Sequence, residues 1–105
     1  MIDRDFFDKK YPDITDNLKC VYDPEIPIDI YELGLIYDIN VAEDNSCMIT
    51  MTLTSPACPV AEQLPESVQR AVEKAGYDPV KINLTFYPPW EKDFVSNDGR
   101  LMLGF

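Results

Sequence analysis

Residues 47–54 read CMITMTLT, and the apolar side chains at every second position are Cys47, Ile49, Met51 and Leu53. A period of two predicts a strand with one buried face and one open face, and threonines dominate the open face. In residues 60–75 the apolar side chains follow a helical spacing, which predicts a helix that ends at Gly76. Pro65 lies within this spacing and predicts either a bend in the helix or a later start of its regular part.

The flanking sequence supplies the remaining elements, which are a helix after Pro12, strands over residues 35–41 and 80–86, and a short helix from residue 90 or 91 to about 97. The helix after Pro12 places Ile14, Leu18 and Val21 on its buried face. Gly34 is the residue best able to take a positive φ. Residues 1–11 are expected to form either a flexible N-terminal tail or a first helical turn. Residues 100–105 form an apolar tail that is expected to dock on the body.

The predicted order is α-β-β-α-β-α, so the fold class is α+β. We expect a single domain over residues 1–105, a two-layer sandwich in which a small three-stranded sheet carries helices on one face. Because one sheet face is apolar and the other is polar, an antiparallel sheet covered on a single side is expected.

Charge and composition exclude several function classes. The chain has 19 acidic and 9 basic side chains, no histidine and a formal net charge of −10. Without histidine it cannot use Ser-His-Asp or Cys-His catalysis or a zinc site with an imidazole ligand. The acidic balance argues against nucleic acid or an anionic membrane as the partner. Residues 1–44 hold twelve acidic and four basic side chains, which form either a solvated face or a docking surface for a basic protein.

The cysteines indicate a reducing compartment. Cys20, Cys47 and Cys58 are an odd number at wide spacing, and no Cys-x-x-Cys pair occurs. The N-terminus does not read as a signal peptide and no stretch reads as a membrane span, so a cytoplasmic location is expected. Cys20 and Cys47 fall on predicted apolar faces, where a thiol acts as a small hydrophobe in the core.

Cys58 differs because it lies between two prolines at the turn from strand into helix. If the helix begins at Pro59 or Val60, its unpaired N–H groups and its dipole favour the thiolate, which is both a nucleophile and a metal ligand. If the helix begins only at Pro65, that effect is largely lost. A buried structural cysteine in the turn is an equally good interpretation.

Other polar or aromatic groups are weaker candidates. Asp23-Pro24-Glu25 could bind a hard cation, act as acid and base, or cap a helix, whereas Asp29 and Glu32 are expected at the surface. The open-face residues Thr50, Thr52 and Thr54 could bind a polar ligand or be covered by another subunit. Residues 86–90, FYPPW, form either a ligand platform or a packed corner.

Three separated motifs then point to one family. They are DPEIPI followed by LGLIY (residues 23–28 and 33–37), TLTSPACP (residues 52–59), and PPW followed by Asp93, Ser96 and Leu103-Gly104. In this order, over residues 14–105, they resemble the SufT-like iron–sulfur assembly family. Its relatives include PaaD and the targeting subunit of the eukaryotic cytosolic iron–sulfur machinery. The chain departs from the family pattern at Glu32, Ala57, Phe86 and Tyr87, and it lacks the later cysteines of PaaD.

The resemblance implies an accessory factor in iron–sulfur cluster assembly of the SUF type, and not an enzyme. It maps Cys58 onto the residue that handles iron or cluster, with Asp23, Glu25 and Thr54 as supporting candidates. The implied partners are assembly scaffold or carrier proteins and client apoproteins, with a homodimer as a further possibility. Because a cluster usually takes four thiolates, a transient cluster would be shared with a second subunit, a client or small thiols.

Two other functions stay open. A thiol enzyme would use Cys58 as nucleophile and Asp23 or Glu25 as proton acceptor. A protein-binding adaptor would keep Cys58 only as a structural residue.

Overall fold

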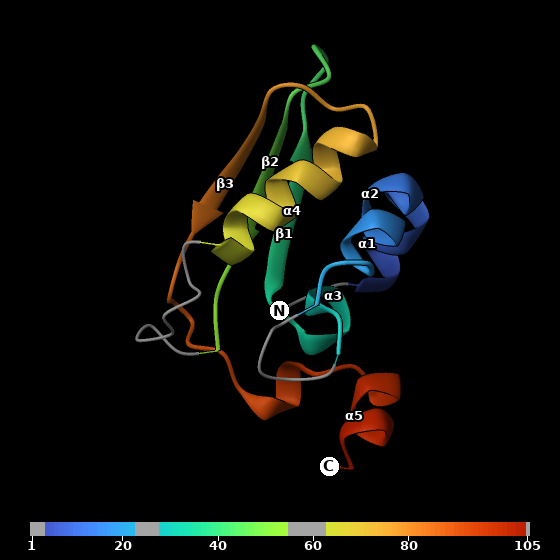
Figure 1. Ribbon diagram of the computed structural model, residues 1–105, viewed down its shortest axis with the longest axis vertical. Coiled ribbons are helices and arrows are strands. Elements are labelled where there is room, and N and C mark those ends of the chain that lie inside the picture. The colour runs from blue at the N-terminus through green and yellow to red at the C-terminus, as the bar shows by residue number, and fades with distance from the viewer. Residues whose placement is uncertain (1–3, 23–27, 55–62, 105) are drawn as a thin grey trace.

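The computed structural model describes residues 4–22, 28–54 and 63–104. Its elements are α1 (Arg4–Lys10), α2 (Pro12–Leu18), α3 (Ile30–Leu33), β1 (Ile36–Val41), β2 (Cys47–Met51), α4 (Gln63–Lys74), β3 (Val80–Leu84), the 3-10 turn η1 (Lys92–Phe94) and α5 (Asn97–Leu103). The predicted α+β class is confirmed, with a three-stranded sheet and helices in front of it (Figure 1).

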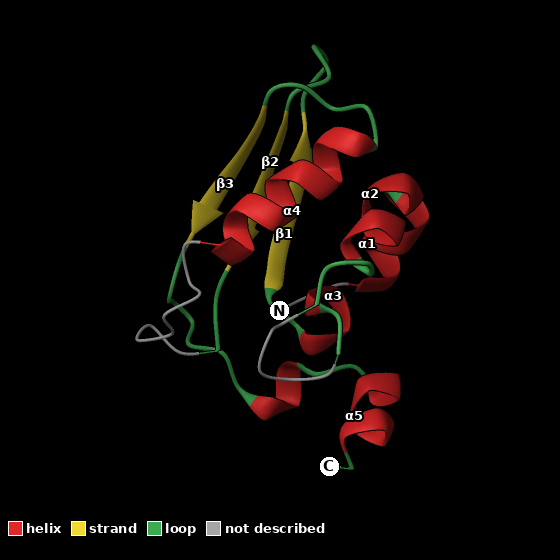
Figure 2. Ribbon diagram, viewed as in Figure 1, coloured by secondary structure: helices red, strands yellow, loops and turns green. Residues whose placement is uncertain are grey.

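The sheet has the strand order β1-β2-β3 and is mixed. β1 and β2 form an antiparallel hairpin whose turn contains Asn45 at φ 70. β2 and β3 are parallel, in a register from Cys47–Val80 to Met51–Leu84. The antiparallel expectation is therefore wrong for this pair, because α4 carries the chain back along the sheet and β3 starts again in the direction of β2. As a result, the ends of β2 and β3 and the start of β1 lie at the same end of the sheet (Figure 2).

The core lies between the sheet and α4. Ile49 and Met51 of β2 are fully buried, as are Val68 and Val72 of α4. The expected apolar stripe of α4 is thus confirmed, and Pro65 is the third residue of the described helix, within its first turn, where a missing N–H does least harm. α2 packs on α4, with Asn17 Nδ2 donating to the Ala71 carbonyl at 2.9 Å.

The N-terminal region is helical. Residues 4–10 form the two-turn helix α1 instead of a tail or a single turn, and Phe7 is buried from it. The next helix, α2, ends at Leu18, and Val21 is only half-buried.

The two cysteines in the described segments have opposite environments. Cys47 is buried as expected, at 3% exposure. The core prediction for Cys20 is wrong, because the helical spacing stops before it; Cys20 is exposed, and its thiol donates to the Asp16 carbonyl at 3.6 Å.

The C-terminal region also differs from expectation. The predicted helix from residue 90 to 97 is the short turn η1, which α5 follows. The expected docking of the tail is wrong for Leu101 and Met102, which are 82% and 70% exposed. α5 instead approaches the body at Gly99, where an added Cβ would lie 2.6 Å from Ile28 Cδ1 and 2.8 Å from Val95 Cγ1. None of the helices in the described ranges is long and apolar enough to cross a bilayer.

Candidate functional site

Parts of all three sequence motifs meet at one end of the sheet. We call this region the motif end and define it as residues 33–37, 52–54 and 85–96. The predicted site residues Cys58, Asp23 and Glu25 lie outside the described residues. The position of Cys58 at the start of α4 therefore stays a prediction. Thr54, four positions before Cys58, is half-buried at the motif end.

The segment that leads toward Cys58 is held between the first motif and the residue that directly follows β3. The Thr52 N–H donates to the Leu35 carbonyl at 2.8 Å, and the Thr85 N–H donates to the Met51 carbonyl at 2.9 Å. β2 therefore ends at Met51, and Thr52 is fully buried instead of lying on the open sheet face as predicted. Its hydroxyl makes no hydrogen bond of acceptable geometry with any described residue.

Side chains of the third motif and the first motif bond to each other's backbone. Trp90 Nε1–H donates to the Leu33 carbonyl at 2.8 Å, and the Tyr37 hydroxyl donates to the Pro88 carbonyl at 2.7 Å. The Tyr37 ring also contacts Phe94 edge-on, with centroids 5.9 Å apart. Of the predicted segment 86–90, only Trp90 is half-buried and packs on the core, whereas the four residues before it are exposed. The packed corner therefore holds for Trp90 alone, and a ligand platform stays a prediction for the rest of the segment.

Helix α3 positions the first motif for these contacts. Asp29 caps its N-terminus by accepting from the Glu32 N–H at 3.0 Å, and Gly34 ends it at φ 88. A Cβ on Gly34 would lie 2.8 Å from Phe94 Cβ, so only glycine permits this approach. Asp29 and Glu32 are half-buried, contrary to the surface prediction. The Asp29 carboxylate is used in a local helix cap, and the Glu32 carboxylate accepts from the hydroxyl of Ser96, a residue far away in the sequence. Burial raises the pKa of Asp29 above its ordinary value.

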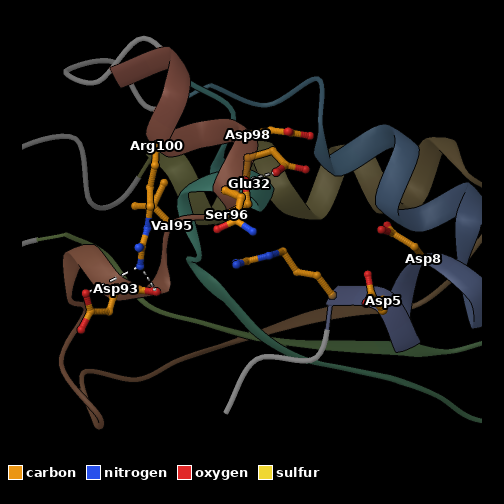
Figure 3. A pocket seen from close by; sticks show the side chains of 10 residues that line it. Asp5, Asp8, Glu32, Asp93, Val95, Ser96, Asp98 and Arg100 are labelled. Carbon is orange, nitrogen blue, oxygen red and sulfur yellow. Dashed lines mark hydrogen bonds and ion pairs between the residues drawn. The ribbon is translucent and has the colours of Figure 1, made fainter. Parts of the chain in front are cut away.

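A pocket of about 550 Å³ opens beside α3, between α1 and α5 (Figure 3). We call it the acidic pocket, and its lining includes the carboxylates Asp5, Asp8, Glu32, Asp93 and Asp98 and the guanidinium groups Arg4 and Arg100. Both arginines are already engaged: Arg4 donates to the Phe94 carbonyl at 2.7 Å and Arg100 to the Asp93 carbonyl at 3.0 Å. The Ser96 hydroxyl donates to the Glu32 carboxylate across the pocket wall.

Burial disfavours ionisation of the Cys47 thiol and of the Tyr37 phenol. Burial, aided by Asp13, raises the pKa of Cys47 to about 11, so its thiolate is disfavoured near neutral pH. Burial also raises the pKa of Tyr37, and Glu91 acts in the same direction while the nearby Thr52 hydroxyl opposes it. Within residues 4–22, 28–54 and 63–104, no group of three Cys, Asp or Glu side chains could hold one metal ion.

The motifs that meet here identify the family. A family model for iron–sulfur cluster assembly proteins matches residues 12–84. The chain belongs to this family. Among its relatives, an iron–sulfur protein maturation auxiliary factor from Porphyromonas gingivalis is 50% identical over 94 residues, which cover 89% of this chain and 90% of that protein. The maturation auxiliary factor SufT from Staphylococcus aureus is 39% identical over 85 residues, covering 80% of this chain and 97% of its own.

Solved structures agree on the fold. A domain of unknown function, DUF59, from Bacillus anthracis superposes with a TM-score of 0.84 at 35% identity, covering 96% of this chain and 94% of that one. The predicted resemblance to the SufT-like family is therefore confirmed.

Sequence reasoning missed how this member of the iron–sulfur cluster assembly family joins its motifs. The sequence predicts neither the Trp90–Leu33 bond nor the acidic pocket, and the prediction of Glu32 as a surface residue is wrong. One signal was available: Ser96 lies three positions before Gly99, the spacing of a helix N-cap, and its hydroxyl accepts from the Gly99 N–H at 3.0 Å.

Proposed function

We propose that this chain is an auxiliary factor in iron–sulfur protein maturation that handles iron or a cluster transiently through Cys58. Membership in the iron–sulfur cluster assembly family and the names of the two relatives support the general role. The observation that supports the assignment of the site to Cys58 is that the three motifs meet at one end of the sheet. The segment that continues from Thr54 to Cys58 starts where residues 33–37 and 85–96 are held together.

The thiols of the chain support sharing of the cluster. Cys47 is buried and its pKa is raised to about 11, so it is a poor ligand in the folded protein. That leaves Cys20, which is exposed, and Cys58, whereas a cluster usually takes four thiolates. One subunit alone therefore has too few ligands, and a second subunit, a scaffold or carrier protein, a client apoprotein or a small thiol supplies the others.

The remaining site residues have supporting roles in this proposal. Asp23 and Glu25 place carboxylates near the iron during transfer, and Thr54 positions the segment that carries Cys58. The role is one of transfer and not of catalysis, consistent with relatives that are named auxiliary factors. We place it in the cytoplasm, where thiols stay reduced.

Reconstitution with iron and sulfide under anaerobic conditions tests the proposal. Wild type and Cys58→Ser are loaded in parallel, and iron bound per chain is measured together with restored activity of iron–sulfur enzymes in cells that lack the wild-type gene. Cys58→Ser should lose both. Cys20→Ser is the matched control, because it also replaces an exposed thiol, and it should retain both.

Equal iron uptake and equal enzyme rescue by Cys58→Ser would contradict the assignment to Cys58. The thiol-enzyme alternative is separated by alkylation, since a nucleophilic Cys58 would react near neutral pH faster than a free thiol. An adaptor with a structural cysteine would instead keep partner recruitment in Cys58→Ala.

A further inference from the structure

Helix α5 presents an apolar surface that no described part of the chain covers. Leu101 and Met102 are 82% and 70% exposed, although α5 contacts the body at its other end. Ser96 caps that end, and Gly99 packs against Ile28 and Val95. The exposure of the two side chains therefore comes from how α5 is anchored. Exposed apolar patches that polar residues surround mark sites of association, and Leu101 and Met102 are the apolar part of this surface.

The surroundings of these two side chains are acidic. Arg100, directly before Leu101, lines the acidic pocket together with Asp98 of the same helix (Figure 3). Asp5 and Asp98 have no ion pair with any described residue, whereas Asp8 lies 3.7 Å from Lys19 and Asp93 lies 3.6 Å from Arg100. The arginines of the pocket bond to the protein's own carbonyl groups. Unpaired negative charge therefore lies beside the apolar surface.

A second copy of this chain fits that surface poorly. It would bring another acidic pocket toward this one, and each chain carries a net charge of −10. Two apolar side chains also fall far short of the roughly 800 Å² per partner that a stable dimer buries, so the surface suits a short segment that binds transiently. Nucleic acid and anionic membranes are repelled by the same charge. The complementary occupant is a protein segment with lysine or arginine beside an apolar anchor.

We propose that Leu101 and Met102, together with the acidic pocket, form a docking surface for a basic amphipathic segment of a partner protein. The apolar face of the segment covers the two side chains, and its cations enter the pocket toward Asp5 and Asp98. A pocket of about 550 Å³ is large enough to take one or two long side chains. The surface does not involve Cys58, so the docking proposal goes beyond the proposed function and is tested independently of it.

Binding of a short acetylated and amidated peptide, with lysine and leucine at helical spacing, tests the proposal. Fluorescence anisotropy of the labelled peptide gives Kd for the full chain and its variants. Leu101→Ser with Met102→Ser should weaken binding about tenfold, the effect of losing one good apolar anchor. Asp5→Asn with Asp98→Asn should weaken it several-fold, and more at low salt than at about 0.15 M ionic strength.

The matched control is Glu43→Gln with Glu73→Gln, which removes the same charge from exposed positions in the β1–β2 turn and the last turn of α4. These regions lie at the opposite end of the molecule from α5 (Figure 1). This control should bind the peptide like wild type, as should Cys58→Ser. The Leu101→Ser, Met102→Ser variant should keep wild-type iron uptake and an unchanged unfolding midpoint.

Three results would overturn the proposal. Equal weakening by the two charge variants would show that the peptide responds only to net charge. Unchanged binding in the Leu101→Ser, Met102→Ser variant would show that these two side chains do not anchor the peptide. A dimer mass in light scattering that this variant converts to a monomer would show that a second copy occupies the surface.

Discussion

Ser96 and Glu32 are joined twice. The Ser96 N–H donates to the Glu32 carbonyl at 2.8 Å, and the Ser96 hydroxyl donates to the Glu32 carboxylate. The same hydroxyl accepts from the Gly99 N–H, so one side chain both starts α5 and fixes that helix to α3. These residues are 64 positions apart in the chain, and their contact brings the third motif onto the first.

Ser96→Ala should lower the free energy of unfolding by about 1–2 kcal/mol, because it removes a helix cap and leaves a half-buried carboxylate without its donor. Denaturant unfolding followed by circular dichroism measures the change. Ser67→Ala is the control: that hydroxyl is exposed and bonds only to the Gln63 carbonyl of its own helix. A loss of equal size in the control would contradict the special role of Ser96.

Trp90→Phe should cost about 1–2 kcal/mol. The ring remains apolar, but the carbonyl of the buried residue Leu33 loses its donor, the partly buried Nε1–H of Trp90. Unfolding is followed by circular dichroism, because the substitution removes the only tryptophan of the chain and therefore its fluorescence signal. Tyr87→Phe serves for comparison, as this neighbouring aromatic residue is exposed, and its stability should match wild type within about 0.5 kcal/mol.

Gly34→Ala should destabilise the fold by about 3 kcal/mol or more. The substitution combines a left-handed backbone, φ 88, with a Cβ placed 2.8 Å from Phe94 Cβ. Gly76→Ala isolates the backbone part, since Gly76 has φ 105 but nothing within 4 Å of its added Cβ. That control should cost only about 1 kcal/mol, and equal losses would contradict the close approach of Gly34 to Phe94.

Cys47 should make stability fall at alkaline pH. Burial raises its pKa from an ordinary 9.0 to about 11, so the fold favours the neutral thiol. The stabilisation is fully present below pH 9 and is lost as pH rises toward 11. Cys47→Ala is less stable near neutral pH because it leaves a cavity, but its deficit relative to wild type should narrow across this window.

Chemical denaturation of both proteins at several pH values measures that deficit. Tyrosines also titrate in the same range, and the comparison cancels the contribution of those that do not interact with Cys47. Tyr77 is the exception, because the Cys47 thiolate helps to raise the pKa of Tyr77. Cys20→Ala, at an exposed position, should show a constant difference from wild type. A constant deficit for Cys47→Ala as well would contradict the prediction.

Local periodicity predicted the elements that bury one continuous face. The alternation from Cys47 to Leu53 and the stripe of α4 were confirmed, because each pattern reflects contact with the same core. Cys20 was misassigned since a pattern cannot show that α2 stops at Leu18. Thr52 was misassigned because its backbone bond to Leu35, a distant residue, ends the strand and turns the side chain inward.

The candidate site was predictable only as separate motifs. Contacts such as Trp90 with the Leu33 carbonyl use a backbone acceptor, and every residue type has one, so the sequence around Leu33 carries no sign of the partner. Similarly, the pairing of β2 with β3 is what brings Thr85 to Met51. The meeting of the motifs is therefore a property of topology and long-range hydrogen bonds.

The attachment of the C-terminal region has a dynamic consequence. Among the described residues after β3, only Phe94 and Val95 are buried apolar residues, and a few hydrogen bonds, such as those between Ser96 and Glu32 and from Arg4 to Phe94, hold this region on the body. The sheet and α4, in contrast, share many fully buried side chains. We therefore expect two tiers of amide hydrogen exchange, with α5 exchanging by local opening and β2 only by global unfolding. Such a protein can adjust its C-terminal helix to an incoming partner while its sheet stays intact.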